Sequence, residues 1–582
     1  MNHQTPYSHI ALSGGLPQAG GLAMRAARLA CDPWDDLTRL LLFGLAVLAA
    51  LTFQDYGITT DELVQQNYGQ YLWNFYASGF TDQTAFTYSN LYLYGGLFDL
   101  LAVGLQRVLP FGVYETRHLL CALFGIAGIA GTWRLARLLG GPRAGFLAAA
   151  LLALTASYYG AMFNNTKDVP FAAGMVWAVY YVTRVGLQLP KPGFGTVVKL
   201  GVVIGLTLAI RIGGIFIGMY LAATIAAGLV LVWREEGTQR ALRAAGASVT
   251  SLLPAVPVAY AVMGVFWPWG VMSPLNPLEA LSTFRKFPFR LETLFEGNLV
   301  FSDQPPASYL PVYLGIKLPE TALVGLVLAV VLAGWWVWTL ARQAPAAGRF
   351  GFIDAADGTR RLLPVVLAAA LPVVMFILMR PTVYNGIRHF MFVVPAMMVL
   401  AGLAFDRVWQ IAETRHARLG QGFCLALTVA AVVHGWTMVR LHPNEYVYYN
   451  RLVGGLPGAA GRFELDYWSN SIREAVLALG RYTEMENGGP LPRHAYRVTV
   501  CANGLSASYF MPSHLKFVND LPDEIMKADF FIIFNQDSDC QNLLNGRTII
   551  EVARDGVPLS VVKDRRDITG TRIVNGVAGA AP

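Results

Sequence analysis

The chain has 582 residues, of which 55% are hydrophobic and only 14% are charged, against about 25% charged residues in an ordinary soluble domain. This composition argues against a soluble globular protein, a coiled coil and a disordered chain, and the long apolar runs indicate a membrane protein. The formal net charge is +7. The basic residues stand singly between apolar runs, however, where they set membrane orientation rather than bind nucleic acid.

Eleven segments are long and apolar enough to cross a membrane. They lie at 37–53, 118–139, 144–163, 169–189, 196–210, 212–233, 248–268, 318–341, 362–379, 388–409 and 420–440. A further segment, 91–109, is long enough to cross but is interrupted by glycines and by Asp99 and Arg107. If it stays at the outer membrane surface, most loop arginines and lysines fall on the side of the N-terminus. The positive-inside rule then predicts a cytoplasmic N-terminus.

These spans divide the chain into three predicted parts. Residues 1–36 form a cytoplasmic tail without an evident signal peptide, residues 37–440 a transmembrane catalytic domain, and residues 441–582 an extracytoplasmic domain. The last part is predicted to be a small α/β domain, because its composition becomes more polar and its apolar pattern changes. Its expected elements are strands at 493–501, 528–534 and 557–562 and an amphipathic helix at 471–482.

Two cysteines, Cys501 and Cys540, lie in this C-terminal domain. We expect them to form a disulfide, since the domain is placed in an oxidising compartment; the alternative is two buried free thiols. The same region contains Asp537-Ser538-Asp539, which we interpret as a solvated turn rather than as a nucleotide-sugar site.

The first outer loop carries two adjacent carboxylates just after the first span. Thr59 and Glu62 match the T-x-x-E capping box, which predicts a helix through Tyr76 with Asp61 in its first turn. In a structural interpretation, Glu62 caps this helix and Asp61 meets the positive end of its dipole. In a functional one, the same helix end keeps Asp61 ionised and able to accept a proton or hold a metal. The pattern leaves both open.

A short outer loop between the third and fourth spans contains Asp168. This residue can cap the next helix, with Pro170 in the first turn. The predicted topology also puts Asp61, Glu62 and Asp168 on one face of the membrane, whereas a crossing at 91–109 would separate them. We therefore expect the three carboxylates to form one candidate catalytic group.

Several cations are expected at the depth of these carboxylates. They are Arg117, Arg211, Lys317 and Arg388, with His389 beside the last. Each cation alone can extend to the membrane interface or form an ion pair with a carboxylate. Together they can bind a phosphate, Lys as a point charge and Arg as a fork. Arg388 is the strongest candidate, because it stands with Tyr384 and Asn385 in a polar cluster flanked by apolar helices.

At these residues the sequence resembles the GT-C glycosyltransferases, and most of all glycosyltransferase family 39. This family includes the protein O-mannosyltransferases and the aminoarabinose transferase that acts on lipid A. The stretches that carry the resemblance are TTDE, NNTKDVPF, RIGG, YNGIRHFMFVVP, HPNEYVYYNRLVGG and FELDYWSNSIREA. They span most of residues 37–480, whereas the chain after about residue 493 matches no motif.

The resemblance implies an inverting glycosyltransferase of the bacterial inner membrane. Its donor would be a sugar on a polyprenyl phosphate, and its acceptor a hydroxyl of a protein, lipid or glycan. Asp61 would be the general base, Glu62 a helix cap, and Asp168 a residue that orients the acceptor or shares a divalent metal with Asp61. The donor phosphate would be bound by Arg388, Arg117, Arg211, Lys317 and His389.

Two other functions fit parts of the pattern. Intramembrane charges also mark the substrate pathways of transporters, but no repeated half is evident and the carboxylates fall in outer loops. A lipid-linked polysaccharide polymerase or ligase would share the topology and the lipid donor, and only its acceptor and the number of sugars transferred would distinguish it.

Overall fold

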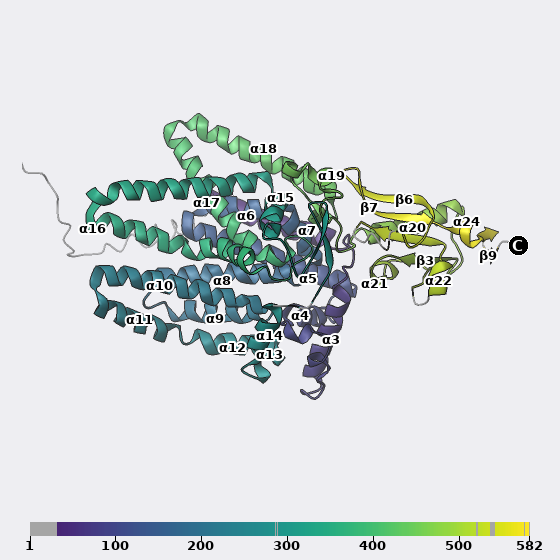
Figure 1. Cartoon of the computed structure of the whole chain (residues 1–582), viewed down its shortest axis with the longest axis horizontal. Coiled ribbons are helices and arrows are strands. Elements are labelled where there is room, and N and C mark those ends of the chain that lie inside the picture. Colours follow the sequence, from purple (N-terminus) through teal and green to yellow (C-terminus); the bar gives the residue numbers. More distant parts are fainter. Residues whose placement is uncertain are drawn as a thin grey trace, which may run out of the picture.

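The computed structural model describes residues 32–285, 287, 289–519, 522–535, 540, 542–574 and 577–580, without the side chains of 285, 340–341, 343–360 and 572–580. The predicted tail before residue 32 and the Asp537-Ser538-Asp539 stretch therefore lie outside the described residues. Figure 1 shows a bundle of long helices with a small sheet domain at one end. This arrangement confirms the predicted fold class, a polytopic helical domain followed by an α/β domain.

The bundle consists of helices that overlap the eleven predicted spans. They are α2 (Pro33–Thr52), α5 (Val113–Gly140), α6 (Pro142–Ala153), α7 (Ala156–Asn164), α8 (Asp168–Gln188), α9 (Phe194–Leu208), α10 (Phe216–Glu236), α11 (Thr238–Leu252), α12 (Ala255–Phe266), α16 (Glu320–Met379), α17 (Val394–Arg415) and α18 (Ala417–Leu441). The spans 144–163 and 248–268 are each divided between two helices, whereas 318–341 and 362–379 lie in one long helix. Within the described chain, seven helices are long and apolar enough to cross a membrane, or eight if the pair α6 and α7, bent by 66°, is one span. The total of eleven crossings remains a prediction.

Local sequence explains where these helices begin and how closely they pack. Asp32 caps α2, its carboxylate accepting a hydrogen bond of 2.9 Å from the Trp34 N–H, and Pro33 occupies the first helical position, where its missing N–H costs nothing. In α5, a Cβ added to Gly125 would collide with the side chain of Met162 in α7. The absent side chain lets the two backbones approach, as is common between membrane helices.

The outer surface of the bundle is apolar where it would face lipid. On α18, for example, Val429 is 54% exposed and Trp436 is 64% exposed. Monomeric soluble proteins rarely present such continuous apolar faces. The exposed face therefore fits a hydrocarbon environment.

Shorter elements gather at the end of the bundle next to the sheet domain (Figure 1). They are α3 (Glu62–Ala77), η1 (Thr84–Phe86), η2 (Leu91–Leu93), α4 (Leu97–Leu105), η3 (Ile212–Ile215), α13 (Pro268–Met272), α14 (Asn276–Arg285), β1 (Glu292–Phe295), β2 (Asn298–Phe301), α15 (Tyr309–Lys317), η4 (Arg388–Val393), η5 (Glu445–Val447), η6 (Arg451–Val453) and α19 (Gly455–Ala459). The uncertain segment 91–109 contributes the nine-residue α4. At about 1.5 Å per residue, α4 is too short to cross a hydrocarbon core of about 30 Å.

The C-terminal domain is built on a five-stranded sheet of order β4-β3-β5-β7-β6. Its elements are α20 (Ile472–Glu486), β3 (Tyr496–Val500), α21 (Gly504–Ser508), β4 (Leu515–Phe517), α22 (Pro522–Met526), β5 (Phe530–Phe534), β6 (Arg547–Arg554), β7 (Val557–Asp564), α24 (Arg566–Thr569) and a separate hairpin of β8 (Thr571–Val574) and β9 (Val577–Ala580). The strands β4, β3 and β5 are parallel, whereas β7 is antiparallel to β5 and β6. The predicted strands and helix of this region correspond to β3, β5, β7 and α20.

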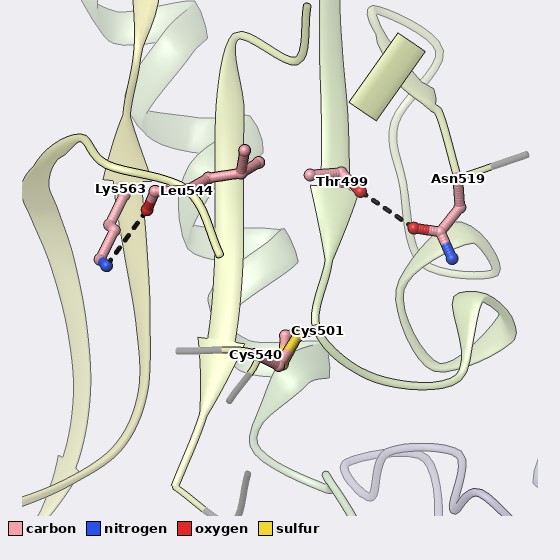
Figure 2. The surroundings of a disulfide bond; sticks show 6 residues. All are labelled: Thr499, Cys501, Asn519, Cys540, Leu544 and Lys563. Atoms are coloured by element: carbon pink, nitrogen blue, oxygen red, sulfur yellow. Dashed lines mark hydrogen bonds between the residues drawn. A yellow bond between two sulfur atoms is a disulfide. The ribbon is translucent and has the colours of Figure 1, made fainter. Parts of the chain in front are cut away.

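A disulfide lies at the end of β3. Cys501 and Cys540 are bonded with their Cα atoms 5.7 Å apart, as Figure 2 shows. The pair packs in an apolar cluster with Phe531, Ile533 and Leu544. The bond fixes the chain at the point where it leaves the sheet toward α21.

Candidate functional site

Four of the predicted site residues form a chain of ion pairs, which we call the Asp61 cluster: Asp61, Arg388, Asp168 and Arg211. The Arg388 Nη2 lies 3.1 Å from the Asp61 Oδ2, and its Nε lies 3.9 Å from the Asp168 Oδ2. The Arg211 Nη2 lies 2.7 Å from the Asp168 Oδ1. Two carboxylates thus alternate with two guanidinium groups. The four residues come from four different segments of the chain.

Helix ends bring these four side chains together. Asp61 is the residue before α3 and Asp168 is the first residue of α8, so each carboxylate lies at the positive end of a helix dipole. Arg211 precedes η3 and Arg388 begins η4, at breaks between long helices. Such breaks let polar side chains project from an otherwise apolar bundle.

The helix α3 begins two residues later than the capping box predicts, which leaves Asp61 outside it. The Glu62 Oε1 accepts hydrogen bonds from the Thr59 N–H at 2.9 Å and from its hydroxyl at 3.1 Å. Asp61 makes no capping hydrogen bond within the described part of the chain. Its carboxylate is therefore free to face the site.

The two aspartates differ in access to solvent. The Asp61 side chain is 47% exposed, whereas the Asp168 side chain is 4% exposed. Asn165 also holds Asp168 locally, donating to the Asp168 Oδ2 at 2.8 Å and accepting from its N–H at 2.9 Å. Asp61 can therefore meet an incoming molecule, and Asp168 is a fixed part of the wall.

Aromatic rings surround the cations of the cluster. The Arg388 guanidinium lies 4.9 Å from the ring centre of Tyr384 and 5.7 Å from that of Trp468. His389 packs edge-on against Tyr384, with ring centres 4.7 Å apart, and its Nε2 lies 3.4 Å from the Arg388 Nε. His389 thus supports Arg388 rather than facing the carboxylates.

Lys167 is a site residue that sequence reasoning left out of its candidate set. Its ammonium lies 4.0 Å from the ring centre of Tyr94. Burial lowers the pKa of Lys167 to about 8; Arg211 adds to this effect, and the carboxylates of Asp99, Asp61 and Asp168 oppose it. Among the described residues Lys167 has neither a hydrogen bond nor an ion pair. Its position directly before Asp168 in the sequence was the signal that could have indicated a site residue.

Glu62 and Arg117 belong to a second group, which we call the Glu62 cluster: Glu62, Asp99, Arg117 and His118. The Arg117 Nη2 lies 2.7 Å from the Asp99 Oδ1, and its Nε lies 4.0 Å from the Glu62 Oε2. The His118 Nε2 lies 3.2 Å from the same Glu62 oxygen. All four side chains are buried, so this group has no open face toward a substrate.

Lys317 lies apart from both clusters. Its ammonium donates a hydrogen bond of 3.1 Å to the Tyr446 carbonyl and packs on the Tyr449 ring at 3.7 Å. Burial lowers the pKa of Lys317 to about 7, although the Glu464 carboxylate opposes this effect. The lysine is thus committed to the junction between α15 and the segment after α18.

The carboxylates do not form a metal-binding group. No set of three His, Cys, Asp or Glu side chains in the described part of the chain is arranged to hold a metal ion. Asp61 and Asp168 are bridged by the Arg388 guanidinium instead. Cations of the protein therefore occupy the space where a shared metal would have to sit.

Comparison with known proteins identifies the relationship. Residues 111–262 match the family model of dolichyl-phosphate-mannose-protein mannosyltransferases, which confirms the predicted resemblance over these residues. No curated protein matches the chain.

Three solved structures show similarity to this chain at low sequence identity. ArnT from Cupriavidus metallidurans bound to undecaprenyl phosphate is 14% identical, with a TM-score of 0.44, over 90% of this chain and 97% of that one. The Archaeoglobus fulgidus oligosaccharyltransferase is 12% identical, with a TM-score of 0.46, over 84% and 65%. The mycobacterial arabinofuranosyltransferase AftD is 14% identical, with a TM-score of 0.39, over 90% and 40%.

Proposed function

We propose that this protein is an inverting glycosyltransferase that moves a sugar from a polyprenyl-phosphate donor to an acceptor hydroxyl at the outer face of a membrane. The observation that carries the proposal is the Asp61 cluster, in which an accessible carboxylate stands beside cations at the end of an apolar bundle. The match to dolichyl-phosphate-mannose-protein mannosyltransferases supports a lipid-phosphate donor. The lipid tail of such a donor can stay in the bilayer while the sugar reaches the Asp61 cluster at the end of the bundle.

In the proposed reaction, Asp61 is the general base. The acceptor oxygen attacks the anomeric carbon from the face opposite the phosphate, and its proton passes to the Asp61 carboxylate. The bond between the anomeric carbon and the phosphate oxygen breaks, and its electron pair leaves with the phosphate. Asp168 keeps its position through Asn165 and Arg211, so it orients the cluster.

The negative charge on the leaving phosphate requires cations that are in place before the reaction. We assign this task to Arg388, Arg211 and Lys167. Lys167 is the first candidate for direct contact, because its ammonium has no competing ion pair among the described residues and lies 4.0 Å from the Tyr94 ring centre. Arg117 and Lys317 have other partners, and we assign them structural roles, with His389 as the support of Arg388.

The decisive experiment is a transfer assay with purified protein in lipid nanodiscs. Polyprenyl-phosphate hexoses and pentoses, labelled in the sugar, are offered together with envelope extracts as the source of acceptor. We expect release of free polyprenyl phosphate together with a labelled product, and neither with Asp61→Asn. A transporter would carry the lipid without cleaving it, so intact donor after prolonged incubation would contradict the proposal.

We further propose that the protein lies in a bacterial inner membrane, with its N-terminus in the cytoplasm and its C-terminal domain outside. The loop between α10 and α11 and the bend of α16 lie at the end of the bundle opposite this domain (Figure 1). The Cys501–Cys540 bond suits an oxidising compartment. Alkaline phosphatase fused after Gly461 should be active, and thiol labelling of the denatured protein should rise after reduction. An inactive fusion would reverse the topology.

A further inference from the structure

The six residues that lead to Asp61 are held mainly by parts of the chain that follow α18. Arg473 donates a hydrogen bond of 3.0 Å to the Asp55 carbonyl, and His442 lies 3.2 Å from the Asp55 carboxylate. The Tyr56 hydroxyl donates to Glu445 at 3.0 Å. This segment, which we call the Asp61 loop (residues 55–60), therefore has its position set from the C-terminal part of the protein.

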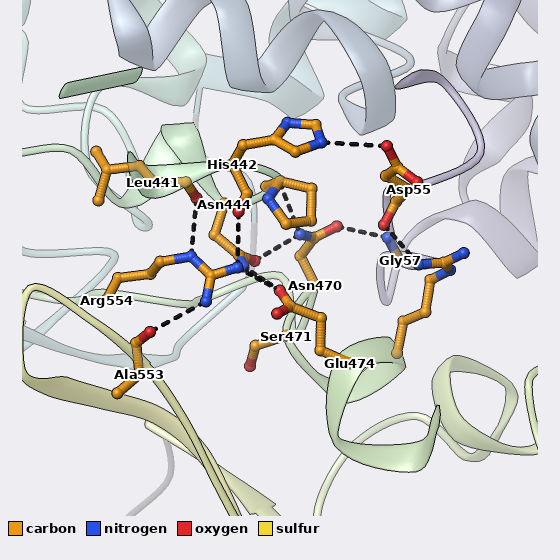
Figure 3. Close-up of polar contacts among 12 residues, drawn as sticks. Asp55, Gly57, Leu441, His442, Asn444, Asn470, Ser471, Glu474, Ala553 and Arg554 are labelled. Atoms are coloured by element: carbon orange, nitrogen blue, oxygen red, sulfur yellow. Dashed lines mark hydrogen bonds and ion pairs between the residues drawn. The ribbon is translucent and has the colours of Figure 1, made fainter. Parts of the chain in front are cut away.

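Asn470 is the central contact of the Asp61 loop (Figure 3). Its side-chain oxygen accepts a hydrogen bond of 2.7 Å from the Gly57 N–H and one of 3.1 Å from the Asn164 side chain. Its amide group donates to the Pro443 carbonyl at 3.0 Å and to the Asn444 side chain at 2.5 Å. All four hydrogen-bonding positions of the amide are thus used, inside a buried environment.

This contact joins the two loops that carry the aspartates. Gly57 lies four residues before Asp61, and Asn164 ends α7, four residues before Asp168. A side chain at Gly57 would collide with the Asn470 backbone oxygen, so the approach is as close as glycine allows. A single amide oxygen therefore fixes one loop relative to the other.

A second contact comes from α21, beyond the disulfide. The Ser506 hydroxyl donates a hydrogen bond of 2.8 Å to the Ile58 carbonyl, and the Asn503 side chain approaches the Thr60 carbonyl at 3.5 Å. Because Cys501 is bonded to Cys540 just before this helix, α21 is tied to the sheet at its own start. The far side of the Asp61 loop thus rests on the C-terminal domain.

The sheet itself is anchored to the same junction. Arg554 at the end of β6 donates hydrogen bonds to the His442 carbonyl at 2.7 Å and to the Leu441 carbonyl at 3.1 Å. It also pairs with Glu474 of α20 at 2.6 Å, as Figure 3 shows. Glu474 in turn accepts from Asn444 at 2.8 Å, the neighbour of Asn470. The hydrogen bonds are continuous from the sheet to the loop.

We propose that the C-terminal domain is a positioning element of the active site, acting through Asn470 and Ser506 on the loop that carries Asp61. This inference rests on the proposed function. It assigns the domain an effect on turnover rather than on binding of the lipid phosphate, because the side-chain hydrogen bonds of Asn470 and Ser506 go to the loop and its neighbours and not to Arg388, Arg211 or Lys167. A displacement of about 1 Å of a catalytic group can cost about 10²-fold in rate.

Three variants test the proposal: Asn470→Ala and Ser506→Ala, which remove contacts to the loop, and Thr499→Val as the matched control. The Thr499 hydroxyl is buried in the same domain and donates to Asn519 at 3.0 Å, as Figure 2 shows. Within the described residues, its side chain makes no hydrogen bond to the Asp61 loop. The turnover number, the Kd for polyprenyl phosphate and the thermal midpoint are measured for each full-length protein in nanodiscs.

We expect the turnover number to fall about 10- to 100-fold in Asn470→Ala and several-fold in Ser506→Ala, with an unchanged Kd for polyprenyl phosphate. Thr499→Val should lower only the thermal midpoint. Wild-type turnover in both loop variants, or a Kd that rises as much as turnover falls, would overturn the proposal. If Asn470→Ala does not fold, the turnover number and the Kd of Ser506→Ala decide between the two outcomes.

A readout without activity separates this inference from the proposed function. Amide hydrogen exchange of a peptide covering residues 54–62 should quicken in Asn470→Ala and Ser506→Ala but not in Thr499→Val. If wild-type protein transfers no sugar, the proposed function fails while the exchange result still decides whether the domain holds the loop. Equal exchange in all four proteins would refute the positioning role.

Discussion

Asp61 and Glu62 are neighbours in the sequence and belong to different sites. The Asp61 side chain is 47% exposed and shares Arg388 with Asp168, whereas the Glu62 side chain is fully buried beside Arg117 and His118. Successive residues at the start of a helix point in different directions, so one carboxylate faces the open end of the bundle and the other its interior. The two carboxylates therefore have different environments, and the different roles that we propose for them rest on this difference.

The two clusters also differ in how their charges are satisfied. In the Glu62 cluster, two carboxylates enclose Arg117, which is itself 0% exposed. Such a buried group resists rearrangement, because any charge left alone there is costly. In the Asp61 cluster, the Asp61 side chain is 47% exposed, so this carboxylate is accessible to an incoming molecule. The first group is suited to structure and the second to chemistry.

The sharpest test of this contrast is Asp61→Asn, which keeps the shape of the side chain and removes the proton acceptor. We expect turnover to fall by about 10² to 10⁴, with folding preserved because the side chain is half exposed. Turnover and the thermal midpoint of the purified protein are measured together. Near-normal turnover here, combined with a large loss in Asp168→Asn, would make Asp168 the base.

Arg117→Ala tests the structural cluster. Removing one partner of a buried ion pair costs about 3 to 5 kcal/mol, because Asp99 and Glu62 would be left without their cation. The thermal midpoint should drop strongly, and little folded protein should be recovered. The exposed Arg134 on the same helix provides the control, and Arg134→Ala should leave stability nearly unchanged. A stable Arg117→Ala protein with a raised Kd for polyprenyl phosphate would move Arg117 into the donor site.

Arg388→Ala tests the cation that links the two aspartates. Loss of a buried charged contact should weaken use of the lipid donor by about 2 to 5 kcal/mol. Arg388→Lys should recover only part of this, since one ammonium cannot reach both carboxylates as a fork does. The ratio kcat/KM for the donor is the measurement. Unchanged donor kinetics in a folded variant would assign Arg388 to structure.

The smallest effect is expected for Glu62→Gln. The remaining oxygen can still accept the hydrogen bonds from Thr59, while the contacts with Arg117 and His118 weaken. We expect a stability loss of about 1 to 3 kcal/mol and turnover within a few-fold of wild type. A turnover loss as large as that of Asp61→Asn would erase the distinction between the two clusters.

The sequence by itself determined the fold class, a polytopic helical domain followed by a small α/β domain. Apolar runs of span length report directly on a lipid environment, and each of the eleven predicted runs overlaps helical segments. Local motifs near helix ends also placed Asp61, Asp168, Arg211 and Arg388 in loops or breaks, where polar residues can gather. These features depend on short stretches of chain, which is why a pattern can reveal them.

Only the tertiary structure decided which charges meet. The sequence ranked Arg388 first among the cations, but it did not reveal that Arg117 pairs with Asp99 or that Arg388 pairs with Asp61 across 327 positions. The same holds for Asn470, whose partner Gly57 lies 413 positions away. Ion pairs and hydrogen bonds act over a few ångströms in space. Which residues form them therefore depends on how segments that are distant in the sequence pack together.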